Sequence, residues 1–283
     1  MLRTQWAVRA LTPDDRDEAL TVCARNPVES CFVAARIDEG ALYAMPGSVL
    51  GVVGADGRLR AIAWASANLV PVGCDDDAIE AIAHKVRRWR RQCASIFGPT
   101  DQVAGLWSRL APGWGPPRTI RRDQPLLATR TDPLAWGITP DLRVRLARND
   151  EIDIVLPAAA AMFTEEIGYP PYAGSSSASY RSVVGGLIRA GRTFIWEQDG
   201  RVLFKGDVGS VGVGAAQIQG VWLAPALRGQ GLAAPLMAAV TSAVLRDIAP
   251  MATLYVNHFN LPARATYAAL GFEQVGTFST VLL

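Results

Sequence analysis

The chain has 283 residues, of which 50% are hydrophobic and 19% are charged, so it is long enough for two domains and can bury a large core. Its 28 Lys and Arg residues against 26 Asp and Glu residues give a formal net charge of +2, which indicates neither a nucleic-acid partner nor a membrane-surface partner. The four cysteines form no CxxC pair and only two histidines accompany them, so we expect neither a metal site nor a disulfide framework.

The start of the chain, MLRTQWAVRALTPDD, carries charges every few positions and lacks the apolar segment of a secretory signal. The longest apolar stretch, residues 231–245, is too short to cross a bilayer and contains Thr241 and Ser242. We therefore expect a cytoplasmic protein that does not enter a membrane. The basic run HKVRRWRR at 84–91 is interpreted as the solvated face of a helix.

The first half of the chain alternates strand-like and helix-like segments. We expect strands within 57–72, a helix at 75–90, a strand at 94–99, a helix at 100–112 and a strand at 119–129. The segment TDPLAWGITPDLRV at 131–144 then places two prolines and a glycine between strand-like segments. It predicts a boundary near residue 140, with domains at 1–140 and 141–283.

The second half follows a similar order. A short strand precedes a helix that begins near Asn149 and Asp150, and strands follow at 192–210 and 215–225, the first of them interrupted by the turn Gln198-Asp199-Gly200. A helix at 231–246, a strand at 252–257, a helix at 261–270 and a closing strand or pair at 272–283 complete it. We predict an α/β (α+β) protein in which one fold is used twice, although no residue-level repeat is visible.

The stretch LAPALRGQGLAAPLMAAV, residues 223–240, predicts an anion site. A strand that ends at Leu223 and a helix that opens at Gly231 present unpaired N–H groups toward one point, where the helix dipole favours negative charge. Gly229 and Gly231 permit positive φ and a close approach of ligand to backbone, and Arg228 supplies a cation. A diphosphate is the expected ligand; a glycine turn before a buried helix, with no ligand, is the alternative.

The string GQGLAA at 229–234 also satisfies the GxGxxG/A pattern of dinucleotide-binding folds. That pattern requires an acidic residue about 20 positions later, at the end of the next strand, where this chain has Asn257 and His258. Too little chain follows to complete such a sheet, so we reject the dinucleotide interpretation.

The segment VWLAPALRGQGLAAPLM resembles the acyl-CoA-binding signature of the GNAT N-acetyltransferase superfamily, in which Q/R-x-x-G-x-G/A follows a strand and starts a helix. Arg228, Gly231 and Ala233 fill that pattern. A second block, LYVNHFNLPARATYAALGFEQVG at 254–276, is similar to the later segment of the family, and the matching residues are Asn260, Arg264, Tyr267, Gly271 and Phe272. The resemblance covers about residues 141–283.

The whole chain also resembles two-domain actinobacterial GNAT proteins whose N-terminal portion is a degenerate GNAT-like unit. The resemblance implies two GNAT-like mixed-sheet domains in tandem. In the first half, the helix that corresponds to 231–246 begins with Asp75, Asp76 and Asp77, where a diphosphate would need N–H groups and a cation. We therefore expect that half not to bind CoA, and we interpret the acids as a helix start.

The family resemblance implies acetyl-CoA, or another acyl-CoA, as co-substrate and no metal. The backbone of the strand before the loop would run beside the pantetheine arm, and the loop would wrap the diphosphate. The expected CoA-binding residues are Val221, Leu223, Arg228, Gly229, Gln230, Gly231, Leu232, Ala233, Ala234 and Asn260, the last of which could also cap a helix. An amine would attack the thioester directly and a tetrahedral oxyanion would form near strand N–H groups.

Two proton transfers accompany this reaction, one from the amine and one to the thiolate. Tyr267 is the candidate acid, with a core-packing role as the alternative. Several family members carry a glutamate on the strand before the loop, where this chain offers Gln217 and Gln219. The candidate bases are therefore a water chain or one of four side chains that are more often solvated: Glu165, Glu166, Asp207 and His258.

The segment EEIGYPPYAGSSSASY at 165–180 is expected to form a loop over the cleft. Tyr169 and Tyr172 would contact the acceptor there, or the loop would be merely structural. Trp222 is expected in the core.

The sequence thus favours an N-acyltransferase that moves an acyl group, expected to be acetyl, onto a primary amine of a small molecule, peptide or protein. The alternative is a non-catalytic CoA-binding sensor or assembly module, and a purely structural glycine loop is a third interpretation. A homo-oligomer is left open, and no nucleic-acid or membrane partner is expected.

Overall fold

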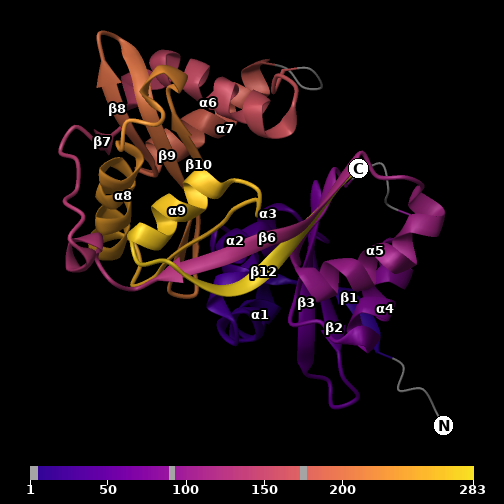
Figure 1. The fold of residues 1–283 in the computed structure, drawn as a ribbon. Coiled ribbons are helices and arrows are strands. Elements are labelled where there is room, and N and C mark those ends of the chain that lie inside the picture. The colour runs from indigo at the N-terminus through magenta and orange to yellow at the C-terminus, as the bar shows by residue number, and fades with distance from the viewer. Residues whose placement is uncertain (1–5, 89–92, 173–176) are drawn as a thin grey trace.

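The computed structural model describes residues 6–88, 93–172 and 177–283. The first half of the chain begins with strand β1 and a group of three helices, followed by a meander of three strands and then by two helices that alternate with two strands (Figure 1). Its strands are β1 (Ala7–Ala10), β2 (Val49–Val53), β3 (Leu59–Ala65), β4 (Asn68–Val72), β5 (Ser95–Pro99) and β6 (Thr119–Thr129). Its helices are α1 (Arg16–Ala24), α2 (Pro27–Asp38), α3 (Ala41–Ala44), α4 (Asp76–Val86) and α5 (Thr100–Trp114).

The second half repeats this order of elements. Its strands are β7 (Arg145–Leu146), β8 (Thr193–Gln198), β9 (Arg201–Gly212), β10 (Ala215–Leu223), β11 (Ala252–Tyr255) and β12 (Glu273–Leu282). Its helices are α6 (Ile152–Ile167), α7 (Ser177–Arg189), α8 (Ala233–Asp247) and α9 (Leu261–Ala269). In each half an antiparallel meander leads through a crossover helix, α4 or α8, to a parallel neighbour.

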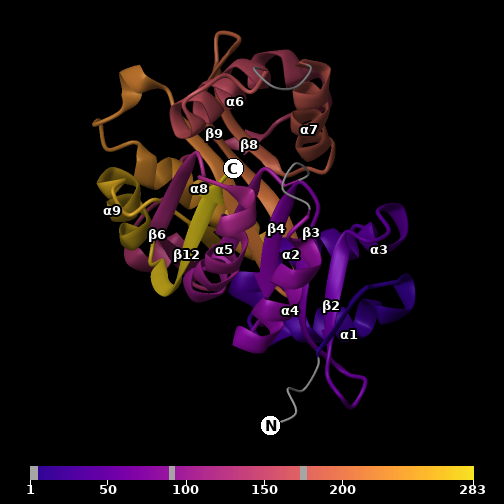
Figure 2. The same ribbon diagram turned by 90° about the vertical axis from the view of Figure 1, so that its right-hand side faces the viewer.

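All twelve described strands form one mixed sheet, in the order β1-β2-β3-β4-β5-β12-β6-β11-β10-β9-β8-β7. The last strand of each half lies in the sheet of the other: β12 pairs with β5, and β6 pairs with β11. The two exchanged strands also pair with each other along most of their length, and both views show them side by side between the halves (Figures 1 and 2). The boundary near residue 140 stays a prediction, but the sheet is continuous across it.

Helices cover both faces of the sheet in each half. In the second half, α8 and α9 pack on one face around Phe204, Val208 and Leu254, whereas α6 and α7 cover the other face around Val155 and Ile195. In the first half, α4 and α5 cover one face and α1 to α3 the other. A further cluster joins the halves, and its buried members are Val28, Cys31, Leu126, Ala128, Ala215, Met251 and Phe278.

The elements expected from the sequence are present wherever the structure describes them. The prediction of a mixed α/β fold used twice is confirmed. One expectation needs correction: residues 165–180 are not one loop, because α6 extends to Ile167 and α7 begins at Ser177. The basic run at 84–91 begins on the last turn of α4, and its residues 89–91 lie outside the described residues.

Burial keeps the four thiols of the chain protonated. It raises the pKa of Cys23 and Cys74 to about 12 and the pKa of Cys31 and Cys93 to about 11, from an ordinary value of 9.0. The unfolded chain would release these protons near pH 9, whereas the folded chain holds them until pH 11 to 12. The contribution of these thiols to the free energy of unfolding is therefore fully present below about pH 9. It is lost as the pH rises above 9, because the unfolded state then binds fewer protons than the folded state.

We expect the free energy of unfolding, measured by urea titration under reducing conditions, to be constant from pH 7 to about pH 9 and to decrease between about pH 9 and pH 11. Substitution of Cys93 by Ala is the control, because it removes one titrating group and should make the decrease shallower. A free energy that does not change up to pH 11 would contradict the burial of these thiols.

Candidate functional site

Strands β10 and β11 separate soon after they begin to pair. Their parallel ladder holds two residue pairs, Ala216 with Ala252 and Gln217 with Thr253. On its other side β10 bulges away from β9, because the register between them skips Gly220 and Val221. Gly220 has a φ of +59°, the left-handed conformation that favours glycine. The second half of β10 therefore has backbone groups that do not pair with β11. These groups lie beside an opening between the two strands.

The loop after β10 carries the predicted anion site. A short 3-10 turn at Pro225–Leu227 leads to Arg228, and the helix begins at Ala233 with Leu232 as its N-cap. Gly229 and Gly231 have φ values of +77° and +74°, and a Cβ on either would meet no atom within 4 Å. Among the residues that the structure describes, no side chain caps α8, whereas Asn26, Asp75 and Asn260 cap α2, α4 and α9. The N–H groups at the start of α8 are thus available to an anion.

Arg228 lies beside this loop and is held by Glu165 from the end of α6. Its Nη2 donates to Glu165 Oε2 at 2.8 Å, and its Nε donates to the carbonyl of Leu223 at 2.9 Å. Trp222 Nε1 also donates to Glu165, at 3.1 Å. Glu165 and Arg228 are 46% and 44% exposed, so the pair contributes little to stability and a diphosphate can replace the carboxylate at low cost. The two predicted site residues therefore contact each other.

The other predicted glutamate, Glu166, faces the first half of the chain. Arg121 on β6 approaches its carboxylate at 3.4 Å and donates to its backbone carbonyl at 2.6 Å. Nearby, the guanidinium of Arg118 lies 4.2 Å from the ring centre of Tyr169. The end of α6 and the following turn are thus held by the first residues of β6. These contacts hold side chains of the first half against the end of α6, next to Glu165.

Tyr267 lies on α9, is 7% exposed and packs in the core with Phe272 at a ring distance of 5.8 Å. Burial, and secondarily the charge of Glu166, raise the pKa of Tyr267 to about 12. The phenol is therefore protonated at neutral pH, as a proton donor must be. Core packing and the predicted acid role are compatible here.

Asp207, expected near a strand end and solvated, lies within β9 and is buried. It forms an ion pair with buried Lys205, two residues earlier on the same strand. The signal was present in the sequence, because the spacing Lys-x-Asp puts both charges on one face of a strand. The ion pair of Lys205 was not predicted, because it becomes apparent only when the two charged residues are considered together.

Local structure explains the second block of the sequence, residues 254–276. Asn260 is the N-cap of α9, because its Oδ1 accepts from the N–H of Ala263 at 3.3 Å. Arg264 donates to the carbonyl of His258 at 3.1 Å and so closes the turn before α9. Gly271 follows the helix with a φ of +78°. These residues set the direction of α9 over the sheet, and a CoA contact of Asn260 stays a prediction.

Gly271 and Gly229 offer a matched comparison. Their φ values are +78° and +77°, but a Cβ on Gly271 would lie 2.0 Å from Trp136 Nε1, whereas one on Gly229 meets nothing within 4 Å. Gly229→Ala is expected to cost about 1 kcal/mol through backbone strain alone, and Gly271→Ala about 3 kcal/mol because the Trp136 ring must also move. Thermal or urea unfolding measures both, and equal losses would contradict the packing of Trp136 on this turn.

Residues 161–272 match the model of the Acetyltransferase (GNAT) family. This part of the chain is a GNAT domain. Residues 47–155 match a second model, described as Domain of unknown function (DUF4081). No curated protein sequence matches the chain. The family match supports an acetyltransferase that uses an acyl-CoA, in agreement with the uncapped loop and the separated strands.

Solved structures share the fold over both halves. A GCN5-related N-acetyltransferase from Sphaerobacter thermophilus has a TM-score of 0.60 at 14% identity, over 100% of this chain and 97% of its own. A tandem GNAT protein from the clavulanic acid biosynthesis pathway has a TM-score of 0.56 at 17% identity, over 98% of each chain. A Drosophila protein has a TM-score of 0.66 at 15% identity, over 98% of each chain. These similarities show the fold.

The first half lacks the open loop of the GNAT domain. Between β4 and α4 the chain has only Gly73, Cys74 and Asp75. Asp75 Oδ1 accepts from the N–H of Ala78 at 2.9 Å, and Gln102 Oε1 accepts from the N–H of Cys74 at 3.1 Å. Side chains of the protein thus occupy N–H groups that a diphosphate would need. The absence of CoA binding in this half stays a prediction.

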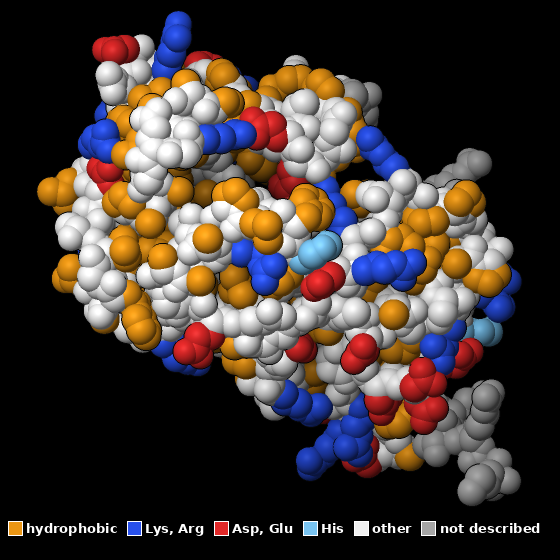
Figure 3. Space-filling model, viewed as in Figure 1, with side chains coloured by type: hydrophobic (Ala, Val, Ile, Leu, Met, Phe, Trp, Pro, Cys, Tyr) orange, Lys and Arg blue, Asp and Glu red, His pale blue; other side chains and the backbone are white. Residues whose placement is uncertain are grey.

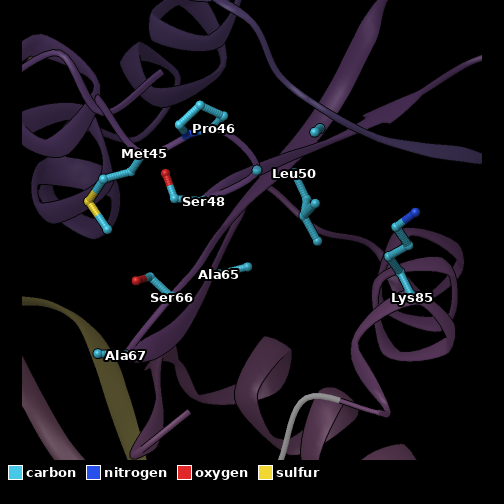
Figure 4. A pocket seen from close by; sticks show the side chains of 10 residues that line it. Met45, Pro46, Ser48, Leu50, Ala65, Ser66, Ala67 and Lys85 are labelled. Atoms are coloured by element: carbon cyan, nitrogen blue, oxygen red, sulfur yellow. The ribbon is translucent and has the colours of Figure 1, made fainter. Parts of the chain in front are cut away.

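A cavity of 750 Å³ lies in the first half, away from this closed loop (Figure 4). Met45, Ser48, Ser66 and Lys85 are among its lining residues. It lies at the start of β2, the end of β3 and the last turn of α4, whereas the closed loop precedes the first turn of α4. The cavity is therefore not the counterpart of the CoA site.

The surface shows no dominance of one charge on the face that carries α8 and α9: acidic and basic side chains alternate there with hydrophobic ones (Figure 3). Among the residues that the structure describes, no group of three or more His, Cys, Asp and Glu side chains is arranged to hold a metal ion. No helix in the described ranges is long and apolar enough to cross a membrane.

Proposed function

We propose that the protein transfers an acyl group, expected to be acetyl, from acyl-CoA to a primary amine. The observation that carries the proposal is the uncapped start of α8, preceded by two left-handed glycines and adjoining a strand that separates from its neighbour. A diphosphate would bind the N–H groups of residues 229–234, with Arg228 as a cation at its edge. The pantetheine arm would lie along the backbone of Val221 and Leu223, beyond the residues of β10 that pair with β11.

The thioester would then lie in the opening between β10 and β11. The amine nitrogen attacks the carbonyl carbon, a backbone N–H of the β10 bulge stabilises the oxyanion, and the carbon–sulfur bond breaks to release the CoA thiolate. Tyr267 supplies a proton to that thiolate. A water molecule near Glu166 accepts the proton of the amine. We place this water near Glu166 and not near Glu165, because Arg228 donates to the Glu165 carboxylate at 2.8 Å, whereas Arg121 approaches the Glu166 carboxylate only at 3.4 Å.

Tyr267→Phe is expected to lower kcat by about 100-fold with little change in the affinity for acetyl-CoA, because the substitution removes the proton donor and keeps the ring. The measurement is chromatographic quantification of free CoA and acetylated product over a panel of primary amines. Tyr255→Phe is the control, since Tyr255 is partly buried, also has a pKa raised to about 12, and lies on β11.

The alternative function, a CoA-binding sensor or assembly module, predicts tight binding of acetyl-CoA without product from any amine. Equal rates in the parent and Tyr267→Phe would remove Tyr267 from the mechanism. A folded parent that transfers acetyl to an amine would exclude the sensor.

A further inference from the structure

A buried ion pair lies beneath the bulge of β10. Lys205 and Asp207 stand two residues apart on β9, so their side chains leave the same face of the strand. These side chains are 1% and 7% exposed, and Lys205 Nζ forms an ion pair with Asp207 Oδ2. Lys205 is one of only two lysines in a chain with 28 Lys and Arg residues. A compact ammonium with three donors is therefore used here in a chain whose other Lys and Arg positions, apart from Lys85, are all arginine.

The same ammonium contacts the bulge. Lys205 Nζ donates to the carbonyl oxygen of Gly220 at 3.3 Å. A Cβ at Gly220 would lie 2.9 Å from Asp207 Oδ2, 3.1 Å from Lys205 Nζ and 3.4 Å from Met162 Cε of α6. The bulge thus rests directly on the ion pair, and both this close approach and the φ of +59° require glycine at position 220.

The bond to Gly220 fixes more than one atom. The carbonyl of Gly220 and the N–H of Val221 belong to one planar trans peptide, in which they point in opposite directions. The register between β9 and β10 skips both residues, so this peptide is not held by that ladder. When Lys205 holds the carbonyl on its side, the N–H of Val221 is directed away from Lys205.

We infer that Lys205 and Asp207 form a positioning pair, which holds the Gly220–Val221 peptide so that the Val221 N–H donates to the thioester oxygen of a bound acyl-CoA. The inference rests on the proposed function and adds two residues to it. Asp207 holds the ammonium in place, while its other oxygen, Oδ1, is buried without a partner among the described residues. An ion pair with an unpaired oxygen is a poor way to stabilise a core, since apolar residues of similar size generally do as well or better.

The test uses the double variant Lys205→Met/Asp207→Leu in the full chain. Either single substitution would leave an uncompensated charge in the interior and destabilise the fold, whereas the double variant removes both charges. The control is Arg181→Met/Asp153→Leu, which removes an exposed ion pair between α7 and α6 in the same half. Acetyl-CoA labelled with 13C at the carbonyl is added, and its affinity and its carbonyl 13C shift in the bound state are measured.

In the parent and the control we expect the bound carbonyl resonance to lie downfield of free acetyl-CoA, because a hydrogen bond polarises the thioester. In the double variant we expect an affinity within about threefold of the parent, a resonance close to the free position, and a rate of CoA release about 100-fold lower. A double variant that binds acetyl-CoA with the parental shift and rate would overturn the inference, as would a parent whose bound resonance equals the free one. A folded parent that does not bind acetyl-CoA would instead overturn the proposed function.

Discussion

Residues 141–283 produced alone are expected to remain unfolded, and so are residues 1–140. In the intact chain β12 lies between β5 and β6, and β11 pairs with β6. Removal of the first half would leave β12 without either neighbour and would expose the apolar side chains of Phe278 and Met251. Unpaired strand edges and exposed core surface favour aggregation over folding. Circular dichroism and urea unfolding of each fragment measure the effect.

Co-expression of the two fragments is the control, because it restores every strand pairing without a covalent link. Leu142 is 96% exposed between the fragments, so a protease can cut the intact protein there and the halves are expected to stay associated. A soluble fragment 141–283 that unfolds cooperatively would show that the exchanged strands are not required for either half to fold.

Arg228→Glu is expected to weaken acetyl-CoA binding by about 100-fold, equivalent to about 3 kcal/mol. The loss of a charge-assisted hydrogen bond accounts for about 2 kcal/mol of it, and repulsion of the diphosphate supplies the rest. The substitution also places a second acid beside Glu165, which frees the end of α6. Equilibrium dialysis with radiolabelled acetyl-CoA gives the dissociation constants.

Arg246→Glu is the matched control for this charge reversal. Arg246 lies in the last turn of α8, is paired with Asp247 and is 69% exposed, so the same charge change occurs on the same helix at the end away from the loop. Its affinity for acetyl-CoA should stay within about twofold of the parent, because exposed charges far from a ligand are screened by salt. Equal losses in both variants would indicate a general charge effect and not a contact of Arg228.

The loop of the candidate site was predictable because its signals are local. Two glycines that need positive φ, a cation and a helix start all lie within residues 228–233, and each acts on its near neighbours. The helix start at Asp75 was predictable for the same reason. Properties that depend on a few consecutive residues are those that sequence patterns describe well.

The strand exchange was not predictable, because a strand pattern does not specify its partner. β6 and β12 both read as strands, but only the three-dimensional packing shows that each enters the sheet of the other half. Helix α7 was missed since Gly185 and Gly186 interrupt its pattern, and tertiary packing of Val184 and Ile188 on α6 stabilises it. The contact between Glu165 and Arg228 joins residues 63 positions apart, beyond any local signal.

The most direct measurement is calorimetric titration of acetyl-CoA into the purified full chain. The account predicts micromolar or tighter binding with one molecule per chain, because no side chain in the described ranges caps α8, while the corresponding N–H groups before α4 are occupied by Asp75 and Gln102. Two molecules per chain would contradict the closure of the first half. No binding by a folded chain would contradict the assignment of residues 229–234 as the CoA site.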